Sequence, residues 1–167
     1  MQSNQVRSDP AVQYHPRPLS DSEESTINEA LAIMERKLSL PGDESFTSPT
    51  MTKEFLTLKL AGYQREVFAV MFMDNRHRLL SFEELFFGTI DGAQVHPREV
   101  VRRALQLNAA AVILAHNHPS GVTEPSRADE SITQRIKEAL SLMEVRLLDH
   151  MIVGGPQVTS FAERGML

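Results

Sequence analysis

Two short apolar runs constrain the fold of this 167-residue chain more than any other feature. The first is "EVFAVMFMD", residues 66–74, and the second is "AAVILA", residues 110–115. The first lies between Gly62 and the turn residues Asp74-Asn75, and both are too short for a typical helix. Short runs of this kind predict strands that are buried on both faces. Such strands need helices on each side of their sheet.

Apolar residues at helical spacing predict these helices. The first begins near Asp21 and ends before Pro41-Gly42. The second has Ser48 as its cap and Pro49 at its first position, where proline is favoured. The remaining predicted elements are helices over residues 97–109 and 126–143 and strands over residues 78–90, 145–155 and 157–162.

This order of elements predicts an α/β protein, built as an α+β sandwich with a mixed central β-sheet flanked by helices. The strands over residues 66–74 and 78–90 should form an antiparallel hairpin that bends near Glu83-Glu84, and the last strand should lie at an edge. The expected organisation is a disordered tail over residues 1–20, a helical extension and linker over residues 21–47, and one folded domain over residues 48–167.

The composition excludes several classes of protein. The chain has no cysteine, so it has no disulfide framework, and a metal would be bound by His, Asp or Glu. Its net charge of −5 does not favour a chain-wide attraction to nucleic acid, although a local basic patch stays open. The N-terminal segment lacks the apolar core of a secretory signal, and no apolar run is long enough to span a membrane. We therefore expect a cytoplasmic protein without a membrane partner.

The second apolar run leads into "HNHPSGVTEPSRAD", residues 116–129. The carboxyl end of a strand is the usual position of a site in open α/β sheets. In extended backbone His116 and His118 point to the same side, and the loop of residues 119–125 could bring Asp129 to them. Two histidines and one carboxylate leave a fourth position for water, as in catalytic zinc sites, where zinc lowers the pKa of that water to about 7.

The same residues also allow a purely structural interpretation. Ser126 and Asp129 match a capping box at the start of a helix. Asn117 and residues 119–121 match ordinary turn chemistry. The spacing alone leaves both interpretations open, although two unpartnered histidines leaving a buried strand would be costly to desolvate. The letters "HNH" do not indicate a nuclease, because the nuclease family of that name has its three residues far apart in sequence.

The stretch resembles the JAMM (MPN+) metalloprotease motif, H-x-H-P-x6-S-x2-D. It matches that motif at His116, His118, Pro119, Ser126 and Asp129. The flanking segments "FFGTIDGAQVHPREVVRRAL" and "LDHMIVG" resemble the RadC family (UPF0758), a group named as DNA-repair proteins that carries a JAMM domain. The resemblance covers about residues 49–165 and implies a JAMM/MPN-like fold with a cytidine-deaminase-like architecture. It is a resemblance to the short, single-domain members, which lack a helix-hairpin-helix segment.

This resemblance implies an activity and a role for each site residue. His116, His118 and Asp129 would bind Zn²⁺, and Ser126 would hydrogen-bond near the metal's water and help to stabilise the oxyanion. Glu66, at the start of the earlier strand, would act as general acid/base. The implied protein is a zinc-dependent metallopeptidase, a hydrolase that cuts a peptide or isopeptide bond in a protein or peptide substrate.

A second hypothesis is a non-catalytic module associated with DNA repair or recombination, with a structural or vestigial metal site. The acidic charge weighs against direct DNA binding, and the complete ligand set weighs against a vestigial site. Glu83 and Glu84 are rivals of Glu66, although the family pattern places them on the following strand. Asp149 and His150 could be partners of the metal ligands, but a satisfied core pair is the favoured interpretation. No feature of the sequence indicates an oligomeric state.

Overall fold

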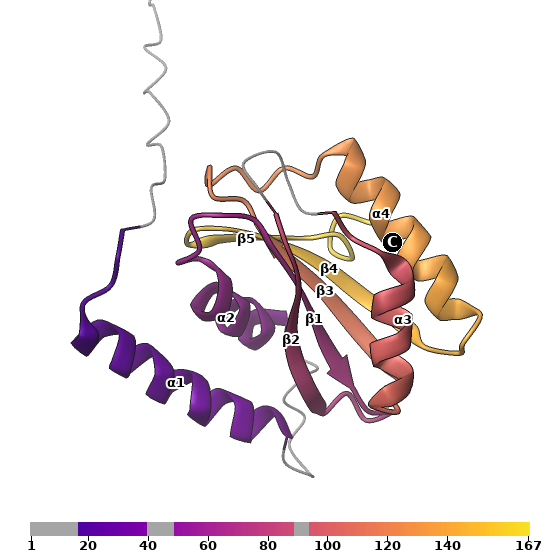
Figure 1. Ribbon diagram of the computed structural model, residues 1–167, viewed down its shortest axis with the longest axis horizontal. Coiled ribbons are helices and arrows are strands. Elements are labelled where there is room, and N and C mark those ends of the chain that lie inside the picture. The colour runs from indigo at the N-terminus through magenta and orange to yellow at the C-terminus, as the bar shows by residue number, and fades with distance from the viewer. Residues whose placement is uncertain (1–16, 40–48, 89–93) are drawn as a thin grey trace, which may run out of the picture.

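The computed structural model describes residues 17–39, 49–88 and 94–167, in which a mixed five-stranded sheet lies between two pairs of helices (Figure 1). The strand order is β2-β1-β3-β4-β5, and every neighbouring pair is antiparallel except β3 with β4. This confirms the predicted fold class and the predicted order of helices and strands. The elements are α1 (Asp21–Ser39), α2 (Pro49–Leu60), β1 (Val67–Met73), β2 (Leu79–Phe87), α3 (Pro97–Gln106), β3 (Ala111–Asn117), α4 (Arg127–Ser141), β4 (Arg146–Gly154) and β5 (Gln157–Ser160).

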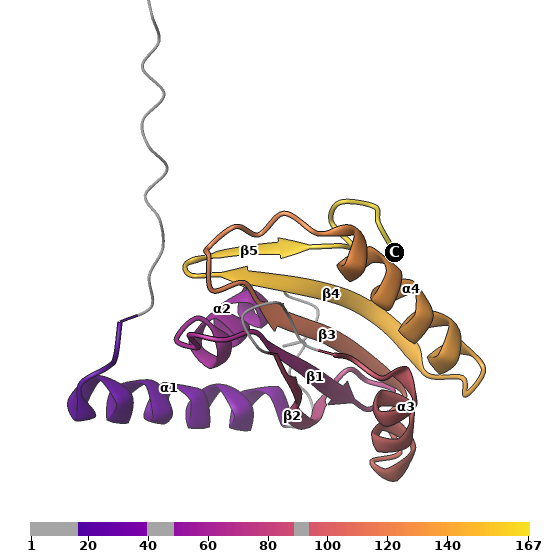
Figure 2. The same ribbon diagram turned by 45° about the horizontal axis from the view of Figure 1, so that its top comes forward.

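Strand β1 is buried along its whole length because it feeds two separate cores. Its odd-numbered residues, from Val67 to Met73, pack in the core under α1 and α2. Its even-numbered residues, from Phe68 to Phe72, pack in the core under α3 and α4. Successive residues of a strand point to opposite faces, so a strand covered on both sides has a continuous apolar run. Figure 2 shows the two helix pairs on opposite sides of the sheet.

Strand β3 is longer than its apolar run predicts. It extends through His116 and Asn117 rather than ending at Ala115. His116 pairs with Phe68 of β1, and both added residues pair with β4. The backbone N–H of His118 also donates to the carbonyl oxygen of Val153 in β4 (2.8 Å). The neighbouring strands therefore continue the ladder past the point where the apolar sequence stops.

Helices α3 and α4 both end a few residues before the predicted position. After α3, Asn108 has a φ of 51°, and after α4, Glu144 has a φ of 56°. In each case the next residue donates its N–H to a carbonyl five residues back, at Ala104 (2.9 Å) and at Leu140 (3.0 Å). This is the hydrogen-bond pattern of a Schellman-type helix end, and it turns each helix directly into the next strand.

The hairpin of β1 and β2 is antiparallel, as predicted. Its register shifts at Leu85, directly after the predicted bend at Glu83-Glu84. The predicted end of this strand, residues 89–90, lies outside the described residues, as do most of the predicted tail (residues 1–16) and the predicted linker after α1 (residues 40–47). No helix within the described residues is long and apolar enough to cross a membrane.

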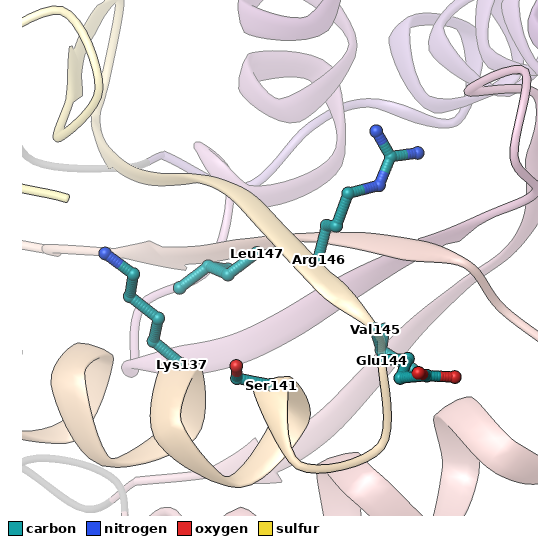
Figure 3. A pocket seen from close by; sticks show the side chains of 6 residues that line it. All are labelled: Lys137, Ser141, Glu144, Val145, Arg146 and Leu147. Carbon is teal, nitrogen blue, oxygen red and sulfur yellow. The ribbon is translucent and has the colours of Figure 1, made fainter.

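An open pocket of about 280 Å³ lies where α4 turns into β4 (Figure 3). It lies at the carboxyl end of α4, whereas Asp129 lies at the amino end of the same helix. The pocket is therefore separate from the predicted site. Its lining residues are Lys137, Ser141, Glu144, Val145, Arg146 and Leu147.

Candidate metal centre

The three predicted ligands lie together where β3 ends and α4 begins. His116 is on β3, His118 follows that strand, and Asp129 is in the first turn of α4. The Nε2 atom of His116 lies 3.0 Å from Nε2 of His118 and 3.2 Å from Oδ1 of Asp129. Nε2 of His118 lies 3.8 Å from Oδ2 of Asp129. One ligand atom from each residue lies within 4.8 Å of the others, so the group could hold a metal ion.

These separations fit a small tetrahedral ion. Ligand atoms bound at about 2.0–2.2 Å around such an ion lie about 3.3–3.6 Å from one another. The separations of 3.0, 3.2 and 3.8 Å lie close to this range, the last two measured to different oxygens of Asp129. Nδ1 of His118 lies 2.6 Å from the carbonyl oxygen of Val122, which can only accept a hydrogen bond, so Nδ1 is the donor. The other nitrogen of a neutral His118 ring, Nε2, is then free to bind a metal. Two histidines and one carboxylate form the donor set of a catalytic zinc site.

Asp129 is held in place by the cap of its own helix. The backbone N–H and the hydroxyl of Ser126 both donate to Oδ2 of Asp129, at 2.7 and 2.6 Å, and the N–H of Asp129 donates back to the Ser126 hydroxyl (3.1 Å). The capping box and the candidate metal group therefore share Asp129. Burial raises the pKa of Asp129, but His116 and Ser126 lower it by more, so the pKa lies well below its ordinary value. The ionised carboxylate is the form that binds a metal.

Glu66 lies one residue before β1. Phe68 pairs with His116 at the end of the antiparallel ladder, and two further residues in this register would set Glu66 opposite His118. The ring of Phe68 stacks on the ring of His116 (5.9 Å between centroids), and residues two apart on a strand share a face. Among the described residues, no hydrogen bond or ion pair joins the Glu66 carboxylate to His116, His118 or Asp129. Continued in this way, the register would place the Glu66 side chain on the same face as Phe68 and His116. The catalytic role of Glu66 stays a prediction.

The two rival carboxylates are bonded to other residues. Glu83 accepts hydrogen bonds from the Arg103 guanidinium, at 2.6 and 2.5 Å. Glu84 lies 2.8–2.9 Å from the hydroxyl of Tyr63, which donates to it. Both glutamates are on β2, as predicted. Neither belongs to the group of residues that could hold a metal.

Asn117 has a role that the sequence did not indicate. It is a buried residue of β3, which agrees with the extended backbone considered for His116 and His118 and not with the alternative of turn chemistry. Its side chain accepts from the N–H of Val67 (2.7 Å) and donates to the carbonyl oxygens of Arg65 (3.0 Å) and Tyr63 (3.3 Å). It therefore ties the segment around Glu66 to the end of β3. A residue between two histidines that share one face must point to the other face, where buried polar atoms need partners.

Asp149 and His150 are neighbours on β4 that perform different tasks. Asp149 accepts from the N–H groups of His150 (2.7 Å) and Ala162 (2.9 Å) and from the hydroxyl of Ser160 (2.5 Å). This fits the predicted structural role. His150 is completely buried, and its Nε2 lies 2.8 Å from Nδ1 of His116. Burial, together with His116, lowers the pKa of His150 well below its ordinary value. His150 is therefore satisfied within the core, as the favoured interpretation expects, and it also contacts a candidate metal ligand, as the alternative expects.

Comparison with known proteins gives consistent matches. A family model described as "RadC-like JAB domain" matches residues 46–166. The chain is 67% identical over 121 residues to a UPF0758 protein of Nitrosococcus oceani, and this match covers 72% of the chain and 54% of that protein. It is 56% identical to a UPF0758 protein of Vibrio cholerae, over 87% of the chain and 90% of the relative. It is 49% identical to UPF0758 protein YkfG of Escherichia coli, over 93% of the chain and 98% of the relative.

Proposed function

The chain belongs to the family of RadC-like JAB domains, and from this premise we propose that it is a zinc-dependent metallopeptidase that hydrolyses a peptide or isopeptide bond. The observation that carries the proposal is the group of His116, His118 and Asp129 at the end of β3. The proposed substrate is a protein or peptide of the cytoplasm. The absence of cysteine is consistent with a reducing compartment.

His116, His118 and Asp129 are the proposed zinc ligands. A zinc ion held by them would supply a water of lowered pKa and would polarise the substrate carbonyl. The His116 ring is completely buried, and that of His118 is about four-fifths buried. Metal binding needs neutral histidines and an ionised carboxylate.

Glu66 is the proposed general acid/base. It takes a proton from the attacking water as the water oxygen bonds to the carbonyl carbon. It then gives this proton to the amide nitrogen as the C–N bond breaks, so that the nitrogen leaves as an amine. The register of β1 on β3, which would set Glu66 opposite His118 if continued by two residues, and the clamp made by Asn117 on the segment around Glu66 support this role.

Ser126 is the proposed hydrogen-bond donor to the oxyanion that develops on the substrate carbonyl. Its hydroxyl lies beside the centre, 2.6 Å from Oδ2 of Asp129. The backbone N–H of Ser126 donates to the same oxygen (2.7 Å), so the carboxylate stays held when the hydroxyl turns to the substrate.

A proteolysis assay tests the proposal. The zinc-loaded chain is incubated with a library of peptides and isopeptide-linked peptides, and new termini are identified by mass spectrometry. We expect cleavage by the wild type and a loss of about 10²–10⁴-fold in Glu66→Gln at unchanged zinc content, because this change removes the proton carrier and keeps the ligands. Glu54→Gln, at an exposed glutamate of α2, is the matched control. Absence of cleavage by the wild type, or full activity of Glu66→Gln, would contradict the proposal.

A further inference from the structure

A chain of hydrogen bonds runs behind the candidate metal centre. The Oγ1 atom of Thr133 lies 2.5 Å from the backbone carbonyl oxygen of Asp129 and 2.6 Å from Nδ1 of His150. Nε2 of His150 lies 2.8 Å from Nδ1 of His116. Thr133 is 3% exposed, and both histidines are fully buried, so water does not compete for these bonds. The chain starts and ends on candidate metal ligands, and it joins α4, β4 and β3.

The direction of each hydrogen bond follows from the fixed end at Asp129. A carbonyl oxygen can only accept, so Thr133 donates its single hydroxyl proton there and accepts from His150 Nδ1. A neutral imidazole has one N–H, so Nε2 of His150 accepts and His116 donates from Nδ1. Nε2 of His116 then carries a lone pair and faces His118 and Asp129. The rings of Phe161 and Phe68 lie 4.8 and 5.5 Å from the His150 ring, measured between centroids. These apolar surroundings favour the neutral form of His150.

We infer that Thr133 and His150 are positioning residues that hold His116 in its Nδ1–H tautomer and so aim its Nε2 at the metal centre. This role rests on the proposed function, because it takes His116 to be a metal ligand. Metal-binding histidines almost always donate their second ring N–H to an acceptor, and loss of that acceptor weakens metal binding. Here the acceptor is another histidine, whose own tautomer is set by a threonine.

The two histidine ligands are therefore held by different devices. His118 donates from Nδ1 to the carbonyl oxygen of Val122, an acceptor that has no alternative state. His116 depends on a ring whose two nitrogens could exchange their roles. Without the Thr133 hydroxyl, Nδ1–H of His150 would have no acceptor there. The pair should then reverse, with His150 donating from Nε2 to Nδ1 of His116, and with His116 protonated on Nε2.

NMR of histidine-ring nitrogens tests this tautomer directly. The intact chain is labelled with ¹⁵N-histidine, stripped of metal and studied at mildly alkaline pH, where two-bond ¹H–¹⁵N correlations identify the protonated nitrogen. We expect Nδ1–H for His116 in the wild type and in Thr133→Ser, which keeps the hydroxyl. In Thr133→Val we expect a shift to Nε2–H. Nε2–H in the wild type, or an unchanged tautomer in Thr133→Val, would overturn the inference.

Zinc affinity provides a second readout that does not depend on activity. Competition between the metal-stripped chain and a chromophoric chelator for Zn²⁺ gives the dissociation constant. We expect Thr133→Val and His150→Phe to weaken binding about 10–100-fold, because loss of such partners typically has this effect. Thr133→Ser, and His150→Gln, which keeps an acceptor near the position of Nε2, should bind nearly as the wild type does.

Thr57→Val is the matched control. Thr57 of α2 also donates its hydroxyl to a carbonyl four residues earlier, that of Lys53 (2.8 Å), but it belongs to the helix pair on the other side of the sheet. Its zinc affinity should equal that of the wild type. If His150→Phe does not fold, the comparison of Thr133→Val with Thr133→Ser and Thr57→Val still tests the inference. Zinc binding by the wild type with unchanged affinity in Thr133→Val overturns the inference alone, whereas absence of binding by the wild type overturns the proposed function.

Discussion

The two faces of β3 show two ways in which one strand is held. Ala111, Ile113 and Ala115 face the core under α1 and α2, where apolar packing holds the strand. Leu114 points to the other face, and there the apolar packing ends at His116, whose polar partners lie on β4 and α4. Residues on the first face can be exchanged for others of similar size. Residues at the end of the second face cannot, because each hydrogen bond fixes the direction of the next.

Breaking the apolar face should have the largest effect on stability. Phe55 of α2 is fully buried and packs edge-on against Phe82 of β2 (5.5 Å). We expect Phe55→Ala to lower the free energy of unfolding by about 3–5 kcal/mol in urea denaturation of the metal-stripped protein, because it removes a large core side chain. The zinc affinity of the folded fraction should not change. The control Ile33→Ala, at a residue of α1 that is 46% exposed, should lie within about 0.5 kcal/mol of wild type. Equal losses in both variants would contradict this account of the apolar face.

A change at Asp149 extends the comparison of two faces to β4, where Asp149 and His150 are neighbours on opposite faces. We expect Asp149→Ala to lower the free energy of unfolding by about 1–3 kcal/mol, because the donors at Ala162 and Ser160 lose a buried acceptor. Asp149→Asn, which keeps one acceptor oxygen, should lose less. Zinc affinity should stay at the wild-type value in both variants, although the next residue, His150, contacts the metal centre. A loss of zinc affinity as large as that of His150→Phe would show that the two faces of β4 are not independent.

The smallest effect concerns an ion pair between β2 and α3. Hydrogen bonds from Arg103 lower the pKa of Glu83 below its ordinary value of 4.5, although burial opposes this. A lowered pKa in the folded state stabilises the protein above the unfolded pKa, and this contribution is lost as the pH falls through the folded pKa. Glu83→Gln should therefore cost about 0.2–1 kcal/mol at neutral pH and progressively less below pH 4.5. A pH series of urea unfolding measures this difference. A constant difference at all pH values would contradict the assignment.

The sequence predicted what depends on local pattern. The run from Val67 to Met73 indicated a strand buried on both sides, and the spacing of His116, His118 and Asp129 indicated a group that could bind metal. The capping box and the candidate metal group are both present in the structure, because Ser126 holds the carboxylate from one side and leaves the other oxygen facing His116.

What the sequence could not predict depends on contacts between distant segments. The end of β3 is set by pairing with β1 and β4, which the apolar run of β3 does not show. The hydrogen bonds of Asn117 could not be predicted, because its partners lie about 50 residues earlier in the chain. The contact between His150 and His116 could not be predicted, because the two residues are 34 positions apart in the chain and lie on different strands. The available signal was His150 itself, a histidine within the apolar run of β4, the strand that pairs with β3 beside His116.

Metal content tests the central claim most directly. The full chain and its variants are purified in parallel, and zinc is measured by mass spectrometry. The account predicts about one zinc ion per wild-type chain and negligible zinc in His116→Ala, His118→Ala and Asp129→Ala. His96→Ala, at a histidine outside the metal group, should keep its zinc. Equal and negligible zinc in the wild type and in all of these variants would contradict the account.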